Sequence, residues 1–453
     1  MKSVPTFRKH TARGVDWAAW FLGIGLGLTL ALQATTMRAS DINSVYSVIA
    51  SISRLAALTG TYFAIVGIFF VARIPAVERG VGHDRLVAWH RKLGPWSLYL
   101  ILLHVLFIVL SFAGQDHIPL YKEMWTFLQT FPWMWPALAG FILMMLAGVT
   151  SYRKARAKMS YETWWIIHIY TYVAIAASFM HQVLNGQMFV NHPLNRLYWT
   201  ALYVLMAAAV VIYRFGIPLL RSLRHNLVVE KVVVEAPGLI SVIMRGRNLK
   251  GLSAEGGQFF GWRFLTRGHF LMSHPYSLSA APTDNHLRIT IKDLGDHSRA
   301  TRHIKPGTRV FVEGPYGAFT AGRATQPHLV MIGGGVGITP IRALMDEFKN
   351  GVQMDVFYRV SRAEELILKD ELDYLEAQSN GMIRVHYMVG SRKEFPMDAE
   401  FLKSYAPRIA DSDIYICGPE ALVETVRKAA EDLGVPKNRF HDEDFAFHPI
   451  NGG

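Results

Sequence analysis

Six apolar stretches fill the first half of this 453-residue sequence and constrain its fold more than any other feature. Each is about long enough to cross the hydrocarbon core of a bilayer, which takes roughly 20 residues of helix. A backbone that crosses lipid must satisfy its own hydrogen bonds, so these stretches predict a bundle of six transmembrane helices. The stretches are residues 15–34, 46–72, 87–112, 133–150, 163–184 and 198–220.

The segments that join these stretches alternate in charge. The N-terminal head and the segments 73–86 and 151–160 are basic, whereas the other three carry about one positive residue each. Basic segments stay on the cytoplasmic side, so we expect a multi-pass protein of the plasma membrane with both termini in the cytoplasm. The net charge is +12, but the basic residues flank the apolar stretches and do not cluster as a nucleic-acid groove would require. This distribution argues against nucleic acid as a partner.

Four histidines lie in the third and fifth stretches. His90 and His104 are 14 residues apart, and His168 and His181 are 13 apart, so each pair spans roughly 20 Å of helix. The two stretches run in the same direction, which pairs His90 with His168 and His104 with His181. An ionisable side chain in lipid is functional by default, and two facing imidazoles can grip one haem iron. The alternative is hydrogen bonding between helices.

Two further expectations concern the predicted membrane helices. Thirteen residues turn a side chain about 140° on an ideal helix, so we expect a bend or bulge between His168 and His181. Arg54 lies in the outer half of the second stretch. It would either bind a haem propionate or an outer substrate, or extend to the lipid headgroups.

From about residue 226 the sequence changes to short β-rich runs separated by turn residues, which predicts a small antiparallel barrel. The string His274-Pro275-Tyr276-Ser277-Leu278-Ser279 lies within it, downstream of Gly257-Gln258-Phe259. A later turn, Gly295-Asp296-His297-Ser298, offers backbone N–H groups and a hydroxyl that suit a pyrophosphate.

The last third alternates strands and helices, which predicts a parallel sheet. The run Gly333-Gly334-Gly335-Val336-Gly337-Ile338-Thr339-Pro340 follows one strand and opens a helix. Glycines in that position let the backbone approach a diphosphate, so we predict a nucleotide site. Cys417-Gly418-Pro419 ends a later strand, where it would border a nicotinamide. Cys417 is either that border or a small core residue, and as the only cysteine it excludes an intramolecular disulfide.

The strings HPYSLS, GGGVGITP and YICGPE follow in that order after stretches with paired histidines. In this combination the chain resembles the NADPH oxidase and ferric reductase superfamily over about residues 15–447. The resemblance implies a six-helix membrane domain with two b-type haems, an FAD-binding β-barrel and an NADPH-binding α/β domain. The boundaries we expect are 1–14 for a cytoplasmic head, 15–222, 223–325 and 326–453.

The resemblance also implies roles for single residues. Tyr276 would pack on the isoalloxazine ring, and Ser277 would hydrogen-bond near its reactive nitrogen. His274 stands where the wider ferredoxin-reductase group has arginine, which points to the oxidase branch. The glycine-rich turn would take the NADPH diphosphate, with Thr339 and Cys417 near the nicotinamide.

Two implied roles keep alternatives. Arg362, after FYRVS, would pair with a 2′-phosphate or would be an ordinary exposed arginine. The aromatic residue that covers the flavin in the family would be Phe445 or Phe447.

The function expected from these features is electron transfer from NADPH through FAD and two haems to an outer acceptor. Our first choice of acceptor is O2, which would give superoxide. The alternatives are a ferric-chelate reductase, a membrane redox module that serves a quinone or protein partner, and a membrane-anchored flavoprotein without haem. The sequence does not indicate an oligomeric state.

Overall fold

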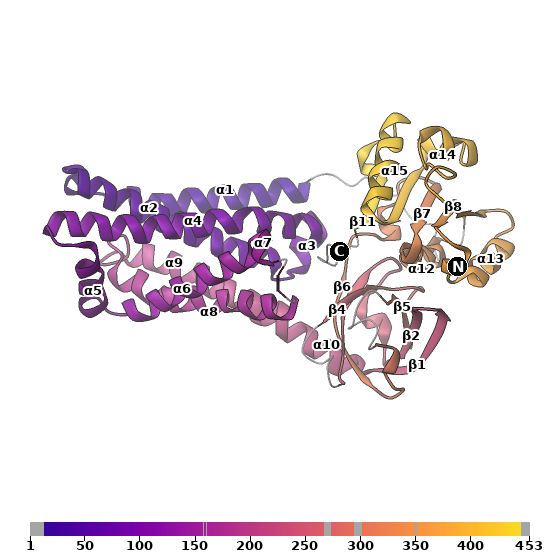
Figure 1. The fold of residues 1–453 in the computed structure, drawn as a ribbon, viewed down its shortest axis with the longest axis horizontal. Coiled ribbons are helices and arrows are strands. Elements are labelled where there is room, and N and C mark those ends of the chain that lie inside the picture. Colours follow the sequence, from indigo (N-terminus) through magenta and orange to yellow (C-terminus); the bar gives the residue numbers. More distant parts are fainter. Residues whose placement is uncertain are drawn as a thin grey trace. The chain divides into compact units, whose positions relative to one another are not determined.

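The computed structural model describes residues 13–156, 158–159, 161–266, 273–293, 301–348 and 351–444. These residues form two compact units that divide between Arg214 and Phe215. In Figure 1 the first unit is a set of long helices, and the second contains all the labelled strands.

The helical unit contains the predicted spans. Its described elements are α1 (Arg13–Ala34), the 3-10 helix η1 (Ala39–Ile42), α2 (Val45–Val71), α3 (Pro75–Val81), α4 (His83–Asp116), α5 (Leu120–Thr130), α6 (Met134–Ser151), α7 (Arg153–Arg156), α8 (Tyr161–Asn185) and α9 (Pro193–Ala209). Six described segments are long and apolar enough to cross a membrane, which confirms the predicted number. They are Gly14–Ala34, Val45–Val71, Arg85–Asp116, Met134–Ser151, Thr163–Asn185 and Pro193–His225.

Small residues let the helices of this unit approach closely. A Cβ atom on Gly60 of α2 would lie 3.0 Å from Cβ of Leu100 on α4, and Ser97 Oγ donates to Gly60 O at 2.7 Å. A Cβ atom on Gly140 of α6 would lie 2.7 Å from the Ala174 oxygen on α8. Such contacts replace the hydrophobic driving force that lipid removes. The helices α4 and α8, which bear the four histidines, are therefore each packed closely against a neighbour.

An antiparallel barrel opens the second unit. It follows α10 (Ile217–His225) and comprises β1 (Leu227–Ala236), β2 (Leu239–Arg245), β3 (Phe259–Phe264), β4 (His274–Ser277), β5 (His286–Lys292) and β6 (Arg309–Tyr316). The strand order is β4-β3-β6-β1-β2-β5, and a bridge between Leu278 and Ile289 brings the two edge strands together. Side chains such as Trp262 and Phe260 fill the interior and are fully buried. This is the predicted barrel.

A parallel sheet follows in the order β11-β10-β7-β8-β9. Its described elements are β7 (His328–Gly334), α12 (Ile338–Phe348), β8 (Gln353–Val360), α13 (Lys369–Gln378), β9 (Ile383–Val389), α14 (Ala399–Tyr405), β10 (Asp413–Gly418), α15 (Glu420–Asp432) and β11 (Phe440–Asp444). Apolar clusters cover both faces of the sheet, as expected for parallel strands. The predicted α/β fold is confirmed.

The barrel and the parallel sheet are joined through α12. A Cβ atom on Gly257 would lie 2.2 Å from the Phe319 oxygen and 2.9 Å from Leu344, so only glycine fits there, at φ +86°. Glu371 of α13 binds Arg288 of β5 at 2.5 Å and Arg342 of α12 at 2.9 Å. The two parts of the second unit are therefore connected by both packing and charge.

Candidate functional site

The rings of His90 on α4 and His168 on α8 lie in a T-shaped contact. Their centroids are 6.0 Å apart, and their planes lie at 83°. His90 Nδ1 is 2.9 Å from the Gly67 oxygen on α2, and His168 Nδ1 is 3.5 Å from Ser151 Oγ on α6. Each ring is therefore held through Nδ1, so Nε2 is the nitrogen left to meet a ligand between the two helices.

The second pair, His104 and His181, lies 14 and 13 residues further along α4 and α8. His104 Nδ1 is 2.9 Å from Ser53 Oγ and 3.2 Å from Ser53 O, while Ser53 Oγ donates to His104 O at 2.9 Å. His181 of α8 lies close enough to His104 for an electrostatic interaction between the rings. The structure thus brings together the same pairs that the direction of the helices predicts.

The spacing of the first pair suits one metal ion between two imidazoles. An imidazole nitrogen lies about 2 Å from a metal that it ligates, so two axial rings have centroids roughly 6 Å apart. The observed 6.0 Å agrees with that value. Hydrogen bonding of the distal ring nitrogen to a carbonyl or hydroxyl is also typical of a ligating histidine, because it fixes the tautomer and the ring orientation. The residues present therefore fit a bis-histidine haem.

Sequence reasoning missed the supporting role of α2. Gly67 and Ser53, which contact His90 and His104, are 14 residues apart, the same spacing as the two histidines on the antiparallel helix α4. A Cβ atom on Gly67 would lie 3.4 Å from His90 Nδ1, so a small residue keeps the carbonyl accessible. The matched spacing is the signal that could have identified both residues.

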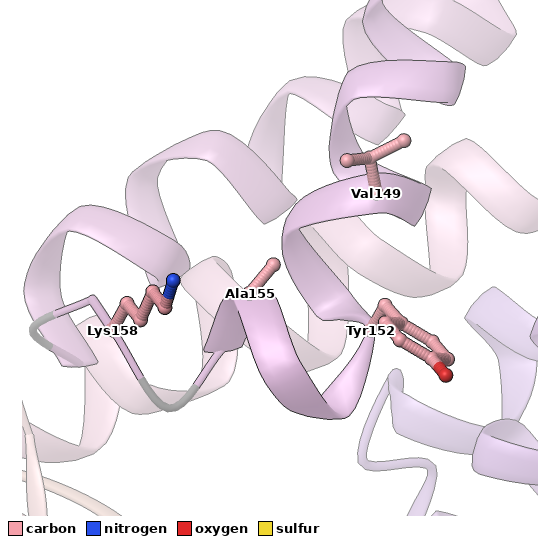
Figure 2. Close-up of a pocket in the computed structure, with 4 residues that line it drawn as sticks. All are labelled: Val149, Tyr152, Ala155 and Lys158. Atoms are coloured by element: carbon pink, nitrogen blue, oxygen red, sulfur yellow. The ribbon is translucent and has the colours of Figure 1, made fainter.

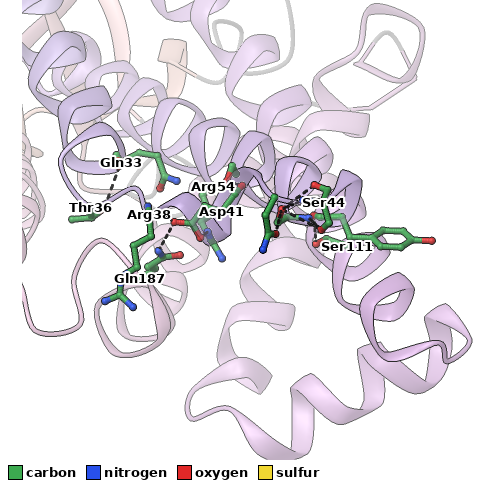
Figure 3. A network of polar contacts seen from close by, with 12 residues as sticks. Gln33, Thr36, Arg38, Asp41, Ser44, Arg54, Ser111 and Gln187 are labelled. Atoms are coloured by element: carbon green, nitrogen blue, oxygen red, sulfur yellow. Dashed lines mark hydrogen bonds and ion pairs between the residues drawn. The ribbon is translucent and has the colours of Figure 1, made fainter.

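Arg54 belongs to a polar network that includes Asp41, Arg38 and Gln187 (Figure 3). Its Nη1 lies 3.3 Å from Oδ1 of Asp41 in η1. Asp41 Oδ2 also accepts from the Arg38 backbone N–H at 2.7 Å and from Gln187 Nε2 at 2.9 Å. Burial acts to raise the pKa of Asp41, but the Arg38 N–H, Gln187 and Arg54 outweigh it and hold that pKa below its usual value. Arg54 is therefore paired with a fixed carboxylate inside the protein.

The predicted flavin motif forms β4. Trp262 Nε1 donates to Tyr276 O at 2.9 Å, which fixes the strand at that residue. Burial raises the pKa of Tyr276 to about 12, so its ring stays neutral. Ser277 is buried, while His274 and Pro275 are half-buried on the same strand. Gly295, His297, Ser298, Phe445 and Phe447, also predicted to bind cofactor, lie outside the described residues.

The glycine-rich turn lies between β7 and α12. A Cβ atom on Gly337 would lie 2.0 Å from the Cys417 oxygen, and one on Gly333 would lie 2.9 Å from Ile338 Cα. A Cβ atom on Gly334 would lie 2.8 Å from Pro419. Gly335 differs, since it has a φ of +57° and its Cβ position meets nothing within 4 Å among the described residues. Close packing thus explains three glycines, and the fourth borders open space beside the start of α12, the kind of position at which helix N-termini bind phosphate groups.

The carboxyl end of β10 borders this turn, and β11 lies on the other side of β10. Cys417 is fully buried, and its Sγ donates to the Glu443 oxygen at 3.5 Å. Thr339 is buried in the first turn of α12, where its hydroxyl donates to Val336 O at 3.0 Å. Glu443 Oε1 is 3.5 Å from the Cβ position of Gly317, which follows β6. Glu443 therefore lies between the sheet and the barrel, although no sequence motif pointed to it.

Three arginines lie near the carboxyl ends of β8 and β9. Arg362 is mostly exposed and donates to Glu365 at 3.4 Å. Arg359 on β8 differs, since its Nε is buried with no hydrogen-bond partner among the described residues. Burial and the charge of the exposed Arg392 lower the pKa of Arg359. Two cations close enough to repel each other favour an anion between them, so Arg359 and Arg392 are candidates that sequence reasoning missed.

A hollow of about 470 Å³ at the end of α6 is lined by Val149, Tyr152, Ala155 and Lys158 (Figure 2). None of these residues belongs to the predicted sites. The lining of the hollow is largely apolar and includes none of the four histidines and no residue of the glycine-rich turn.

Three family models match successive parts of the chain. The ferric reductase like transmembrane component matches residues 56–179, the FAD-binding domain matches residues 225–320, and the oxidoreductase NAD-binding domain matches residues 331–428. The first match contains both histidine pairs, and the third contains the glycine-rich turn.

Curated relatives match about half of the chain. A flavohemoprotein of Halalkalibacterium halodurans is 29% identical over 246 residues, which are 49% of this chain and 59% of that protein. A flavohemoprotein of Vibrio cholerae is 30% identical over 55% of this chain and 68% of its own length. NADH-cytochrome b5 reductase 1 of Pyricularia oryzae is 28% identical over 49% of this chain and 76% of its own length.

Solved structures also superpose on part of the chain. The FAD/NAD-binding domain of a nitric oxide dioxygenase from Vibrio cholerae covers 49% of this chain and 98% of its own, with 24% identity and a TM-score of 0.40. The cytochrome b5 reductase domain of Ulva prolifera nitrate reductase covers the same shares, with 16% identity and a TM-score of 0.42.

The three domain models define the chain as an oxidoreductase that carries FAD- and NAD(P)-binding domains together with a ferric-reductase-like membrane domain. A protein with these domains in this order belongs to the NADPH oxidase and ferric reductase superfamily.

Proposed function

We propose that this protein carries electrons across the plasma membrane from cytoplasmic NADPH to O2 at the outer face. The overall reaction is NADPH + 2 O2 → NADP⁺ + H⁺ + 2 superoxide, so each NADPH supplies two single electrons. The observation that carries the proposal is that His90 lies beside His168 and that His104 lies near His181, with each pair between α4 and α8. Two b-type haems, when bound there, would supply a one-electron path between the membrane faces.

The residues of the chain contribute positioning to this reaction. In the membrane domain, the Gly67 carbonyl and Ser53 orient the two imidazoles of α4. In the second unit, the open space at Gly335 would admit the nucleotide diphosphate, and buried Thr339 and Cys417 would exclude water from the nicotinamide. Tyr276 and Ser277 would hold the flavin, whose chemistry converts a two-electron hydride transfer into single electrons.

The preference for NADPH rests on Arg359 and Arg392. The buried Arg359 Nε lacks a partner among the described residues, and a guanidinium matches the geometry of a phosphate. The 2′-phosphate of NADPH would accept the missing hydrogen bond from Arg359, and Arg362 would contact the solvent-exposed side of that phosphate. NADH is the second candidate, because Glu365 already engages Arg362 and lies beside the same strand end.

A ferric chelate is the second candidate acceptor. Arg54 lies near His104 and makes only one hydrogen bond among the described residues, so it has donors left for an anion. A membrane redox module serving a quinone or protein partner remains the third proposal.

The test uses the full chain in proteoliposomes with NADPH outside and an impermeant acceptor trapped inside, then with the two exchanged. We expect NADPH on one side to reduce the acceptor on the other side, with b-type bands in the dithionite-reduced spectrum. Replacing His104 with Leu should stop transfer across the membrane and spare NADPH-driven reduction of a soluble flavin acceptor. Transfer that persists in that variant, or a purified protein without haem bands, would refute the proposal.

A further inference from the structure

The charge beside the second histidine pair is balanced within the protein. Arg54 lies on α2 next to Ser53, the residue that binds His104, and its charge acts on that ring. A lone arginine there would attract anions strongly, because Coulomb interactions gain strength where water is scarce. Asp41 supplies the opposite charge, with its Oδ1 3.3 Å from Arg54 Nη1. The side chain of Asp41 is 11% exposed and that of Arg54 is 19% exposed.

Asp41 is held in place by several chain segments. The Arg38 backbone N–H and the side chain of Gln187 both donate to Oδ2, and Ser51 Oγ donates to the Asp41 carbonyl at 2.9 Å. Gln187 comes from the segment between α8 and α9, so η1, α2 and that segment meet at one carboxylate (Figure 3). The carboxylate itself accepts from Arg38 N–H, Gln187 Nε2 and Arg54 Nη1, so it does not move aside readily for an incoming ligand.

We infer that Asp41 determines the acceptor class of the second histidine pair: by neutralising Arg54 it selects a small uncharged acceptor over an anionic ferric chelate. The inference rests on the proposed function, because it concerns the site at which electrons leave the chain. Oxygen enters a neutral site without any charged anchor, and superoxide, as an anion, leaves it more readily than it would leave an unpaired arginine. A chelate that carries net negative charge would bind less tightly here, because Asp41 offsets the charge of Arg54 even though other guanidinium N–H groups remain open.

In both cases the acceptor gains one electron. O2 becomes superoxide, and an Fe(III) chelate becomes the Fe(II) chelate with its charge one unit more negative. The electron comes from NADPH in either case, and no further reactant is needed. The difference between the two acceptors therefore lies in how they bind.

The experiment compares Asp41→Asn with the parent protein in lipid nanodiscs supplied with NADPH. The acceptors are O2, with superoxide measured by dismutase-sensitive cytochrome c reduction, and Fe(III)–EDTA, with Fe(II) measured by ferrozine. Rates that persist in His104→Leu come from the flavin and are subtracted. We expect Asp41→Asn to raise kcat/KM for Fe(III)–EDTA relative to O2 by about tenfold, because an unpaired cation raises the local concentration of an anion.

Matched variants separate this role from a structural one. Asp41→Glu keeps the charge and should keep the parent selectivity, and adding Arg54→Gln to Asp41→Asn should abolish the gain. Asp116→Asn removes an exposed carboxylate from the end of α4 and should change nothing. If Asp41→Asn lacks haem, the rate of Fe(III)–EDTA reduction by the parent protein is measured at increasing salt concentration instead. A neutral site predicts a rate that does not change with salt, which supports the inference. A rate that falls steeply with salt indicates a basic site and overturns it.

The outcomes distinguish the two proposals. Unchanged selectivity in haem-replete Asp41→Asn, or an equal gain in Asp116→Asn, overturns the inference alone. Acceptor reduction that is the same in His104→Leu as in the parent protein overturns the proposed function and this inference with it.

Discussion

Hydrogen bonds from α2 determine which ring nitrogen of His90 and of His104 points away from that helix. Ser53 does this for His104 through both its hydroxyl and its carbonyl, and Gly67 does it for His90 through its carbonyl alone. The sequence revealed the histidines, because ionisable residues stand out in an apolar stretch. It did not single out their hydrogen-bond partners Ser53 and Gly67, since serine and glycine are common in membrane helices.

Replacing Ser53 with Ala should weaken haem binding at the second pair by about tenfold or more, the usual cost of losing a residue that orients a metal ligand. The carbonyl of Ser53 stays, so binding should be weakened and not abolished. The measurement is the ratio of haem to protein after detergent purification. Thr59→Ala, which removes an exposed hydroxyl from the same helix, is the control. Equal haem content in both variants would contradict the role given to Ser53.

Arg359 gives a second test on a single side chain. Arg359→Ala should raise the KM for NADPH by about tenfold or more and leave the KM for NADH nearly unchanged, because only NADPH carries the 2′-phosphate. Arg362→Ala should have a smaller effect of the same kind, since that side chain is exposed and bound to Glu365. Arg384→Ala, an exposed arginine on β9, controls for loss of positive charge. Equal losses with both nucleotides would show that Arg359 acts on folding alone.

Helices and strands with a clear period were predictable from the sequence, and the others were not. The six spans, β1, β2, β7, β8 and β10 all follow long apolar or alternating runs. β3 (FFGWRF) has no alternation because both of its faces are buried, and only its first residue, Phe259, falls in a string that the sequence analysis singles out. α5 lies in a segment expected to be a loop, since its apolar residues are interrupted by Lys122 and Glu123.

The turn between β7 and α12 allows two glycines to be compared within one element. Gly337→Ala would place a methyl group 2.0 Å from the Cys417 oxygen, so α12 must shift away from β10. Gly335→Ala meets open space and costs only the strain of its positive φ, about 1 kcal/mol. We therefore expect Gly337→Ala to release FAD at a much lower temperature than Gly335→Ala, as measured by flavin fluorescence on heating. Similar melting in both variants would contradict the packing argument.

For the second unit as a whole, Glu371 supplies the ionic part of the connection between barrel and parallel sheet. Burial acts to raise the pKa of Glu371, but hydrogen bonds and charge from Arg288 and Arg342 lower it below its ordinary value of 4.5. A lowered pKa contributes stability that is fully present above pH 4.5 and is lost as the pH falls below it. Protonation therefore weakens the link between the two nucleotide domains.

Glu371→Gln should remove this acid-dependent contribution and slow hydride transfer from NADPH to FAD a few-fold at neutral pH. Stopped-flow reduction of the flavin and melting curves between pH 4 and pH 7 in the full chain would measure both effects. Glu424→Gln, which affects an exposed pair with Arg427, is the control. A parent protein whose melting does not change across that range would refute the linkage.

The single cysteine has a practical consequence. Since Cys417 is the only thiol in the chain and none of it is exposed, surface positions can each be given one reactive sulfur without a background to remove. Paired spin or dye labels would then report whether the nucleotide-binding unit changes conformation during turnover. The same shielding leaves no accessible sulfhydryl in this sequence for the proposed superoxide product to attack, so the chain should resist thiol oxidation during turnover.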